Sequence, residues 1–227
     1  MPAISIILPT LNEEAQIVAG LQALQPLRGQ NCELIVADGG SRDRTAALAK
    51  PLADQVIMSA RGRAAQMNAG ASKAQGDILW FLHADSLPPP DAVELIRAVL
   101  SNPDRHWGRF DVRLSGCHPA LRMVETLMNV RSRLTSIATG DQGIFIRRTL
   151  FEQIGGYPSI ALMEDIALSR LLKRYGRPAC LRQRLQTSSR RWERDGIIRT
   201  ILLMWRLRLA YFLGADPDRL ARNYYRS

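Results

Sequence analysis

The stretch ISIILPTLNEE, residues 4–14, places polar and acidic residues directly after an apolar strand. The same order recurs twice, because the apolar runs 34–36 and 78–82 lead into the motifs ADGGS (37–41) and HAD (83–85). In an open α/β sheet, ligands bind in the crevice outside the carboxyl ends of the strands. We therefore expect the three motifs to meet in one nucleotide and metal site.

Strand and helix patterns alternate through the first hundred residues, which indicates an α/β domain with a mostly parallel sheet. Strands are expected at 4–8, 33–38, 55–58 and 77–82, and helices at 13–24, from 41 onward, at 62–74 and at 92–100. In the less regular second half, strands are expected at 109–114 and 143–147, and helices at 121–133, 163–175 and 197–213. We expect one structural unit, with a main domain over 1–192 and a basic, amphipathic helical extension over 193–227.

The composition is that of a globular protein. The chain has 227 residues, of which 46% are hydrophobic, enough for a full core. Its three cysteines lie far apart and show no metal-ligand spacing, which indicates a reducing cytosol rather than a disulfide framework. The N-terminus lacks the charged and apolar pattern of a signal peptide. We therefore expect a cytoplasmic protein.

The net charge is +10, and most of the excess lies near the C-terminus. Residues 182–227 contain eleven Arg, no Lys and four acids, a net charge of +7. Such a region suits an anionic partner, whether a nucleotide, a nucleic acid, a phosphorylated acceptor or a membrane surface, and it is equally typical of a solvated face. Because no RNA-binding signature is present, we expect no nucleic-acid partner.

Three positions after the first strands suit a nucleotide, and each has a structural interpretation as well. Glu13 suits either a helix start or a ligand contact. Asp38, which precedes two glycines, can accept hydrogen bonds from a base or a ribose, or it can be a turn residue. Arg63, near the start of an Ala-rich helix, suits a pyrophosphate.

Asp85 is the candidate metal ligand, since it follows an apolar strand and precedes the proline-rich loop 88–90. One carboxylate at such a strand end can hold Mn²⁺ or Mg²⁺ that also binds two phosphates, because these cations take oxygen ligands. His83 lies two residues earlier, on the same side of an extended chain. It is a candidate for a metal or ribose contact, and also for an ordinary loop histidine.

Together these motifs resemble the family-2 glycosyltransferases, which have the GT-A fold. The matching segments are PTLNEE (9–14), ADGGSRDRT (37–45), GRAAQMNAG (62–70), LHAD (82–85), GDQGIF (140–145) and MED (163–165). The similarity runs from residue 4 to about residue 192. It looks closest to the short bacterial radical-SAM/selenodomain-associated glycosyltransferase-2-like proteins. It implies a mostly parallel central sheet flanked by helices.

The resemblance also implies roles for individual residues. The implied nucleotide-binding residues are Pro9, Thr10, Asn12, Glu13, Asp38, Arg63, Asn68 and Asp85. Asp85 matches the last acid of the family's D-x-D metal motif, and His83 stands where the first acid would be. Asp165 matches the catalytic base, with Glu164 as the competing carboxylate. The implied acceptor-side residues are Asp141, Gln142, Gly143 and Trp192.

The implied reaction is an inverting, metal-dependent transfer of one hexosyl-type sugar from a nucleotide-diphosphate donor, a UDP-sugar, to an acceptor hydroxyl. Processive members carry Q-x-x-R-W, whereas this chain has Ser188 at the Gln position before Arg191 and Trp192. A single transfer is therefore expected. The acceptor stays open, with lipid-linked acceptors among the candidates.

Two other classes of protein remain as alternatives. One is a sugar-1-phosphate nucleotidyltransferase, which would carry a Gly-rich basic loop after the first strand, where this chain has Asn12-Glu13-Glu14. The other is a non-catalytic module that binds nucleotide or membrane. Metal-dependent binding of UDP favours the transferase, and its absence favours the module.

The segment 196–214 is apolar but is interrupted by Arg199, Arg206 and Arg208. It is too short and too charged to cross a bilayer, which takes about 20 apolar residues. It can lie peripherally on an anionic membrane, at the inner face, or it can pack on the transferase core. The sequence leaves both alternatives open.

Overall fold

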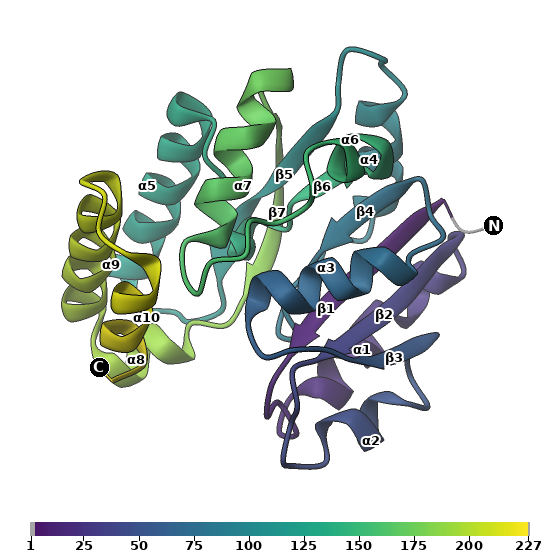
Figure 1. The fold of residues 1–227 in the computed structure, drawn as a ribbon, viewed down its shortest axis with the longest axis horizontal. Helices are drawn as coiled ribbons and strands as arrows, with labels where there is room; N and C mark the ends of the chain where they lie inside the picture. Colours follow the sequence, from purple (N-terminus) through teal and green to yellow (C-terminus); the bar gives the residue numbers. More distant parts are fainter. Residues whose placement is uncertain (1–2, 227) are drawn as a thin grey trace.

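The centre of the molecule is one mixed sheet flanked by helices (Figure 1). The computed structural model describes residues 3–226, and within them the sheet has seven strands in the order β3-β2-β1-β4-β6-β5-β7. The strands are β1 (Ile4–Thr10), β2 (Cys32–Asp38), β3 (Gln55–Met58), β4 (Ile78–Phe81), β5 (Trp107–Leu114), β6 (Phe145–Arg147) and β7 (Ala179–Thr187). β6 runs antiparallel to β4 and β5, and every other pairing is parallel.

The carboxyl ends of β1, β2 and β4 meet at one edge of the sheet, as the sequence predicts. Thr10 of β1 pairs with Asp38 of β2, and Ile7 of β1 pairs with Phe81 of β4. Because these pairings are parallel, the loops that follow the three strands leave the sheet on the same side. The three motifs that follow β1, β2 and β4 therefore lie together.

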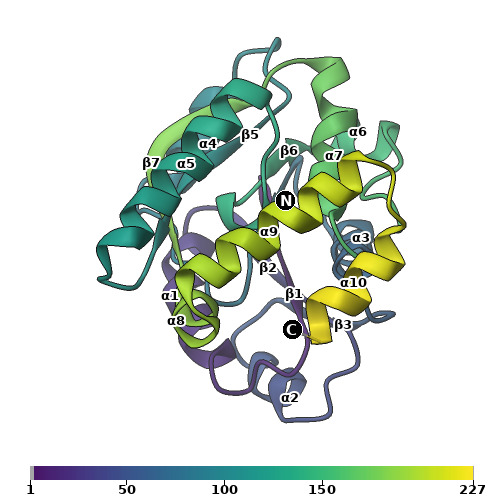
Figure 2. The ribbon, with the colours of Figure 1, turned by 90° about the vertical axis from the view of Figure 1, so that its left-hand side faces the viewer.

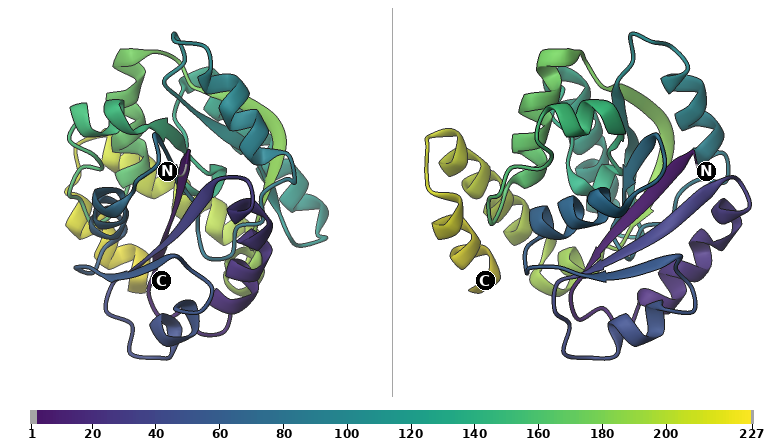
Figure 3. Two further views of the ribbon diagram at one scale, coloured as in Figure 1. Left: turned by 90° about the vertical axis from the view of Figure 1, so that its right-hand side faces the viewer. Right: turned by 45° about the vertical axis from the view of Figure 1, so that its right-hand side comes forward.

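Helices cover both faces of the sheet (Figure 3). The α-helices are α1 (Ile17–Arg28), α2 (Thr45–Ala49), α3 (Arg63–Lys73), α4 (Ala92–Leu100), α5 (Pro119–Thr135), α6 (Arg148–Gln153), α7 (Glu164–Leu172), α8 (Arg190–Asp195), α9 (Ile197–Phe212) and α10 (Pro217–Arg226). Two short 3-10 helices, η1 (Gly140–Gln142) and η2 (Lys173–Tyr175), precede β6 and β7.

Alternation along β1 divides the core into two layers. Ile4, Ile6 and Leu8 pack with α1, α2 and α4, whereas Ile7 packs with α3, α6 and α7. Successive side chains of a strand point to opposite faces, so one apolar strand serves both layers. All four side chains are fully buried, and each such burial stabilises the fold by roughly 1.5–3 kcal/mol.

Some boundaries differ from those expected. α1 begins at Ile17 rather than at Glu13, because Asn12 has a left-handed backbone (φ 55°) and residues 13–16 form a turn. β7 and α6 are not anticipated by the sequence patterns, whereas α8 and α10 are anticipated only as part of the helical extension over 193–227 and not as separate helices. β7 lies at the edge of the sheet, and its residues Arg182 and Arg184 interrupt the alternation of apolar and polar residues that would predict a strand.

The C-terminal extension folds back onto the main domain, where α9 and α10 cover the start of α7 (Figure 2). Leu207 of α9 and Leu220 of α10 are buried against Leu162, Met163 and Ile166. Packing on the core, one of the two alternatives from the sequence, is therefore observed. Among residues 3–226, every helix is too short or too polar to cross a membrane.

We predict that Gly20→Ala destabilises the protein. Gly20 of α1 packs so closely on the turn after β4 that a Cβ atom would lie 1.9 Å from the carbonyl oxygen of Ala84. A clash with backbone cannot be relieved by a rotamer change, so the free energy of unfolding should fall by about 1–3 kcal/mol. Urea denaturation measures the change.

The matched control is Gly29→Ala at the end of the same helix. There the nearest atom to an added methyl group would be the Pro26 carbonyl oxygen at 3.6 Å, and the backbone has an ordinary helical φ of −63°. The control should unfold within about 0.5 kcal/mol of the parent. Equal stability of both variants would contradict the proposed contact between α1 and the turn after β4.

Candidate active site

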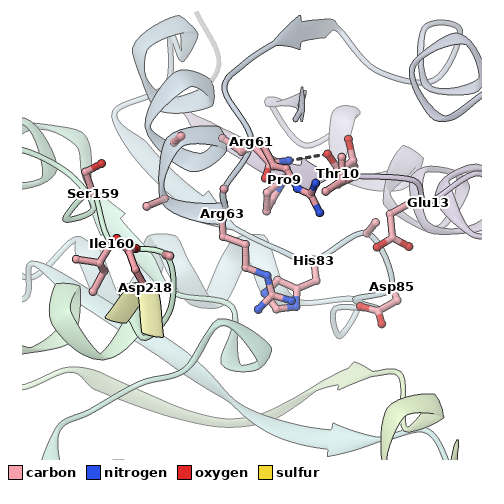
Figure 4. A pocket seen from close by; sticks show the side chains of 17 residues that line it. Pro9, Thr10, Glu13, Arg61, Arg63, His83, Asp85, Ser159, Ile160 and Asp218 are labelled. Atoms are coloured by element: carbon pink, nitrogen blue, oxygen red, sulfur yellow. Dashed lines mark hydrogen bonds between the residues drawn. The ribbon is translucent and has the colours of Figure 1, made fainter. Parts of the chain in front are cut away.

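A cavity of about 620 Å³ lies at the edge where the strand ends meet. Its walls come from the end of β1, the start of α3, the turn after β4, a loop before α7, and α10 (Figure 4). Six of the sequence-predicted site residues line it, namely Pro9, Thr10, Glu13, Arg63, His83 and Asp85. The cavity is large enough for a nucleotide-sized ligand.

Arg63 is the first residue of α3, and its side chain extends across the cavity towards His83 (Figure 4). Gly62 precedes it with φ 129°, a backbone conformation that favours glycine. The unpaired N–H groups at the start of a helix attract anions, and a guanidinium adds a full positive charge. This wall of the cavity therefore suits a phosphate or diphosphate group.

Two carboxylates, Glu13 and Asp85, lie close together on the other side of the cavity (Figure 4). Burial raises the pKa of Glu13, and the charge of Asp85 raises it further. Among the described residues, no group of three or more His, Cys, Asp and Glu side chains is arranged to hold a metal. Two neighbouring carboxylates suit a divalent cation that takes its remaining ligands from phosphate and water, as Mg²⁺ usually does.

His83 is neutral at physiological pH. Burial lowers its pKa to about 4, and the positive charge of Arg63 acts in the same direction. Its Nδ1 atom lies 3.6 Å from Oδ1 of Asp141. At Gly140, a Cβ atom would come within 2.5 Å of the imidazole, so the absence of a side chain lets this loop approach His83.

The acid pair Glu164–Asp165 opens α7, where the helix dipole favours negative charge. The backbone N–H groups of Gly140 and Ile166 donate to Asp165 at 3.0 and 2.7 Å. Burial raises the pKa of Asp165, and burial together with the Asp165 charge raises the pKa of Glu164 to about 7. Glu164 therefore keeps its proton to a higher pH than an exposed glutamate does.

The acid pair does not line the cavity but is connected to it by the loop of η1. Asp141 faces His83 from this loop, and the adjacent Gly140 donates to Asp165. Burial raises the pKa of Asp141, whereas Arg63 and Arg131 lower it. The predicted acceptor-side loop thus lies between the cavity and the predicted base.

Asp38 is fully buried and is not part of the cavity wall. Its carboxylate accepts hydrogen bonds from the backbone N–H groups of Gly40 and Ser41, at 2.9 and 2.7 Å, and from the hydroxyls of Ser41 and Thr10, at 2.6 and 3.3 Å. Asn12 joins the same turn by accepting from the N–H of Arg42 at 2.9 Å. The turn interpretation of Asp38 is therefore observed, and its contact with a base stays a prediction.

Asn68 is also not part of the cavity wall. Its Nδ2 donates to the carbonyl oxygen of Tyr157, and its Oδ1 accepts from the N–H of Tyr157, both at 2.9 Å. The amide is thereby occupied in holding the loop that leads to α7. Asn68 therefore positions that loop, and its contact with a nucleotide stays a prediction.

The remaining acceptor-side predictions fall on residues that support the fold. Gln142 is fully buried, and it accepts from the N–H of Thr139 at 3.2 Å. Gly143 has φ 57°, and a Cβ atom there would meet Leu185 at 2.7 Å. Trp192 packs in an apolar cluster with α5 and α9. These three residues hold the surroundings of the site, and Asp141 alone of the four faces a cavity-lining residue, His83.

Sequence patterns missed several residues of the cavity wall. Gln66 donates to the carbonyl oxygens of Thr10 and Ala37 at 2.6 and 3.1 Å, and so binds α3 to the ends of β1 and β2. It lies inside the motif GRAAQMNAG, which was a usable signal. The loop 159–161 and Asp218 of α10 also line the cavity, although no motif marks them.

Parallel strand ends that converge on the start of a helix are typical of nucleotide-binding α/β proteins. Within that class, the sequence profile of glycosyl transferase family 2 matches residues 5–155. The chain belongs to this family. Membership favours glycosyl transfer over the nucleotidyltransferase and non-catalytic alternatives.

Curated relatives support the same family. The chain is 26% identical over 194 residues to a probable glycosyltransferase of Bacillus subtilis, a match that covers 74% of this chain and 46% of that protein. It is 31% identical over 134 residues to the undecaprenyl-phosphate 4-deoxy-4-formamido-L-arabinose transferase of Pseudomonas paraeruginosa, covering 49% and 40%. The chain therefore spans less than half the length of these relatives.

Solved structures show the same fold. Glucosyl-3-phosphoglycerate synthase of Mycobacterium tuberculosis, crystallised with Mn²⁺ and UDP-glucose, matches with a TM-score of 0.62 and 23% identity, covering 82% of this chain and 70% of that chain. At this identity the likeness establishes the fold alone. The predicted GT-A architecture is confirmed.

We predict that the parent protein loses stability as the pH rises from 5 to 8, and that Glu164→Gln removes the part of this loss that comes from ionisation of Glu164. A carboxyl whose folded pKa is about 7, against an ordinary 4.5, binds more protons when folded. Its contribution to stability is complete below pH 4.5 and is lost as the pH rises through 7. The variant should match the parent at pH 5 and exceed it at pH 8 by roughly 1–3 kcal/mol. Denaturant unfolding at both pH values measures this difference.

Glu152→Gln on α6 provides the control, because that carboxylate is exposed to solvent. The difference in stability between Glu152→Gln and the parent should be the same at pH 5 and at pH 8. If Glu164→Gln also shows no change between pH 5 and pH 8, the carboxyl of Glu164 is not held in its protonated form by burial.

Proposed function

We propose that the chain transfers a hexosyl-type sugar from a UDP-sugar donor to an acceptor hydroxyl, with inversion at the anomeric carbon. The observation that carries the proposal is the position of Arg63. Its charge acts on Glu13 and His83 in the cavity and also on Glu164 and Asp165 beyond it. A diphosphate bound beside Arg63 would lie between a cation-binding side and a carboxylate base.

The donor is proposed to lie in the cavity, with its diphosphate against Arg63 and the start of α3. Pro9, Thr10 and Glu13 line the same cavity and are the proposed nucleoside contacts. Asp38 would reach a base only after its turn rearranges, since the residues of that turn and Thr10 already donate to both of its oxygens. The Mycobacterium tuberculosis neighbour was crystallised with UDP-glucose, which supports a UDP-sugar.

Asp85 and Glu13 are the proposed holders of Mn²⁺ or Mg²⁺, together with oxygens of the diphosphate. Burial is the main cause of the raised pKa of Glu13, and the charge of Asp85 adds to it, a negative charge that a cation would neutralise. When bound, such a cation supplies Lewis-acid stabilisation of charge on the leaving diphosphate. The neutral imidazole of His83 is a further candidate ligand or a ribose contact.

Asp165 is proposed as the base. The acceptor oxygen forms a bond to the anomeric carbon while the bond from that carbon to the diphosphate oxygen breaks on the opposite face. The acceptor proton passes to the Asp165 carboxylate, and the electron pair of the broken bond leaves with UDP. The bonds that Asp165 accepts from Gly140 and Ile166 hold its carboxylate in one orientation for this step.

A single transfer to a lipid-linked acceptor is proposed for the physiological reaction. The Pseudomonas paraeruginosa relative carries undecaprenyl phosphate in its name, which supports an acceptor of this kind. Residues 1–192 would form the transferase domain and 193–227 its basic extension. A lipid-linked acceptor also supports a location at the inner face of the membrane.

We predict that Asp85→Ala abolishes the Mn²⁺ dependence of UDP binding while the fold persists. Asp85 lies in a turn and its single described hydrogen bond, from Thr187, is long at 3.5 Å, so its loss should cost little stability. Calorimetric titration of UDP with and without Mn²⁺ should show an affinity difference of about tenfold or more in the parent and none in the variant.

Asp91→Ala removes an exposed carboxylate from the same loop, outside the cavity, and serves as the control. It should retain the metal dependence of the parent. A folded Asp85→Ala protein with unchanged Mn²⁺-dependent affinity would remove Asp85 from the proposed metal site.

We predict that Asp165→Asn binds UDP and Mn²⁺ normally but loses transfer by about 10²-fold or more, the loss expected for a general base. Glu164→Gln should lose less, since adjacent helical residues point about 100° apart and only one can face the acceptor. Release of UDP in the presence of acceptor measures the rate. Near-normal turnover of Asp165→Asn together with loss in Glu164→Gln would assign the base to Glu164, and loss in neither would direct the search to Asp141.

A further inference from the structure

Large exposed apolar side chains are concentrated on two helices, α5 and α9. Over residues 3–224, whose side chains the structure describes, thirteen such side chains are exposed, and ten of them lie on these helices or at their ends. The ten are Met123, Leu127, Val130, Leu134, Ile198, Leu202, Trp205, Leu209, Phe212 and Leu213. Such a concentration exceeds the single exposed apolar residues found on ordinary protein surfaces.

Each helix has an apolar stripe that faces away from the protein. On α5 the stripe has the spacing 123, 127, 130 and 134, and on α9 it has the spacing 198, 202, 205, 209 and 212. These spacings place each set on one side of its helix. Leu121 of α5 and Leu207 of α9 are buried on the opposite sides. Both helices are therefore apolar on two sides, which is unusual at a water-exposed surface.

The two stripes belong to one surface. Met128 of α5, Ile197 and Ile201 of α9 and Trp192 of α8 meet in one apolar cluster. Figures 1 and 2 both show α5 and α9 next to each other on the same side of the molecule. We name this surface, formed by the ten exposed residues of α5 and α9, the α5–α9 face.

The charges on the α5–α9 face indicate which kind of partner binds to it. Among the exposed residues of the two helices, only Arg199 and Arg206 are charged, and neither helix exposes an acid. A symmetric pair of chains would bring the same face, with the same positive charges, against itself. An anionic bilayer offers both an apolar interior for the stripes and phosphate groups for the arginines.

We propose that the α5–α9 face inserts into the surface of an anionic membrane, with both helices lying in the plane of the interface. Trp205 lies within the stripe of α9, and tryptophan favours the level of the lipid headgroups. The proposal adds α5 to the membrane contact suggested for 196–214. It goes beyond the proposed function, because it concerns a surface outside the cavity and requires no transfer activity.

The face is also linked to the cavity. α9 passes through Gly214, with φ 88°, into α10, and Asp218 of α10 lines the cavity. A bilayer bound along α9 would therefore lie one short helix away from the proposed donor site. This arrangement suits an acceptor that is presented from the membrane.

The test measures co-sedimentation of full-length protein with vesicles of phosphatidylcholine alone and of phosphatidylcholine mixed with phosphatidylglycerol. The parent should bind the mixed vesicles and bind the neutral vesicles more weakly. Leu127→Glu on α5 and Leu209→Glu on α9 should each reduce binding about tenfold or more, because a carboxylate opposes both insertion and the anionic surface. Both side chains are more than half exposed, so the variants should fold.

Met58→Glu is the matched control, since Met58 is 66% exposed but lies on β3, away from the α5–α9 face. It introduces the same charge and should bind mixed vesicles as the parent does. Equal losses in Met58→Glu and Leu127→Glu would attribute binding to net charge alone and would overturn the proposal.

Trp205 supplies an independent readout of insertion. It is 64% exposed, whereas Trp80 and Trp107 are fully buried and Trp192 is half-buried in the cluster with α5 and α9. A blue shift of emission with mixed vesicles should therefore come mainly from Trp205. Trp205→Phe should keep binding and lose most of the shift. Unchanged emission of the parent on bound vesicles would contradict insertion.

Sedimentation velocity distinguishes the membrane from a second copy of the chain. The proposal requires that the parent does not use this face to dimerise. If the parent is a dimer and Leu127→Glu is a monomer, the α5–α9 face joins two copies and the proposal is wrong. Vesicle binding is measured without donor or acceptor, so its failure leaves the proposed transfer reaction to its own tests.

Discussion

Two hydrogen bonds between the side chain of Asn68 and the backbone of Tyr157 join the two parts of the active site. Asn68 lies on α3, which begins at Arg63, and Tyr157 lies in the loop that leads to the acid pair at the start of α7. Gly156 permits the approach, because a Cβ atom there would lie 2.6 Å from the Asn68 oxygen. These bonds therefore tie the proposed anion-binding wall to the loop that leads to the proposed base, and a transfer between two bound substrates requires such positioning.

One arginine, Arg63, acts on four acids of the candidate site. Burial raises the pKa of Glu13, Asp141, Glu164 and Asp165, and the charge of Arg63 lowers the pKa of every one of them. A diphosphate placed beside Arg63 would draw on the same positive charge and leave the acids less compensated. A divalent cation between Glu13 and Asp85 would offset that loss, so donor and cation should each increase the affinity of the site for the other.

The sequence predicts the donor half of the fold and less of the rest, for physical reasons. Apolar runs followed by polar motifs at 4–14 and 83–85 predict the shared sheet edge, because parallel pairing is a general constraint. The turn role of Asp38 was one of the two interpretations that the sequence allows, because its partners Gly40 and Ser41 are close in sequence. The bonds of Asn68 to Tyr157 could not be predicted, since only the fold brings these residues together. β7 could not be predicted from the sequence, because a strand at the edge of a sheet tolerates exposed charges such as Arg184, which interrupt the apolar pattern.

The sequence pattern alone could not decide between the two interpretations of 196–214, packing on the core and lying on a membrane. A helix that packs on a protein and a helix that lies on a membrane each need one apolar side, and α9 has both. Its inner side is buried against Leu162 and Ile166, so the position of the helix does not depend on lipid. The outer side of α9 would then insert into a membrane as an apolar surface whose position is already set by the fold. Insertion of such a preformed face requires no folding step, which lowers the entropic cost of binding a membrane.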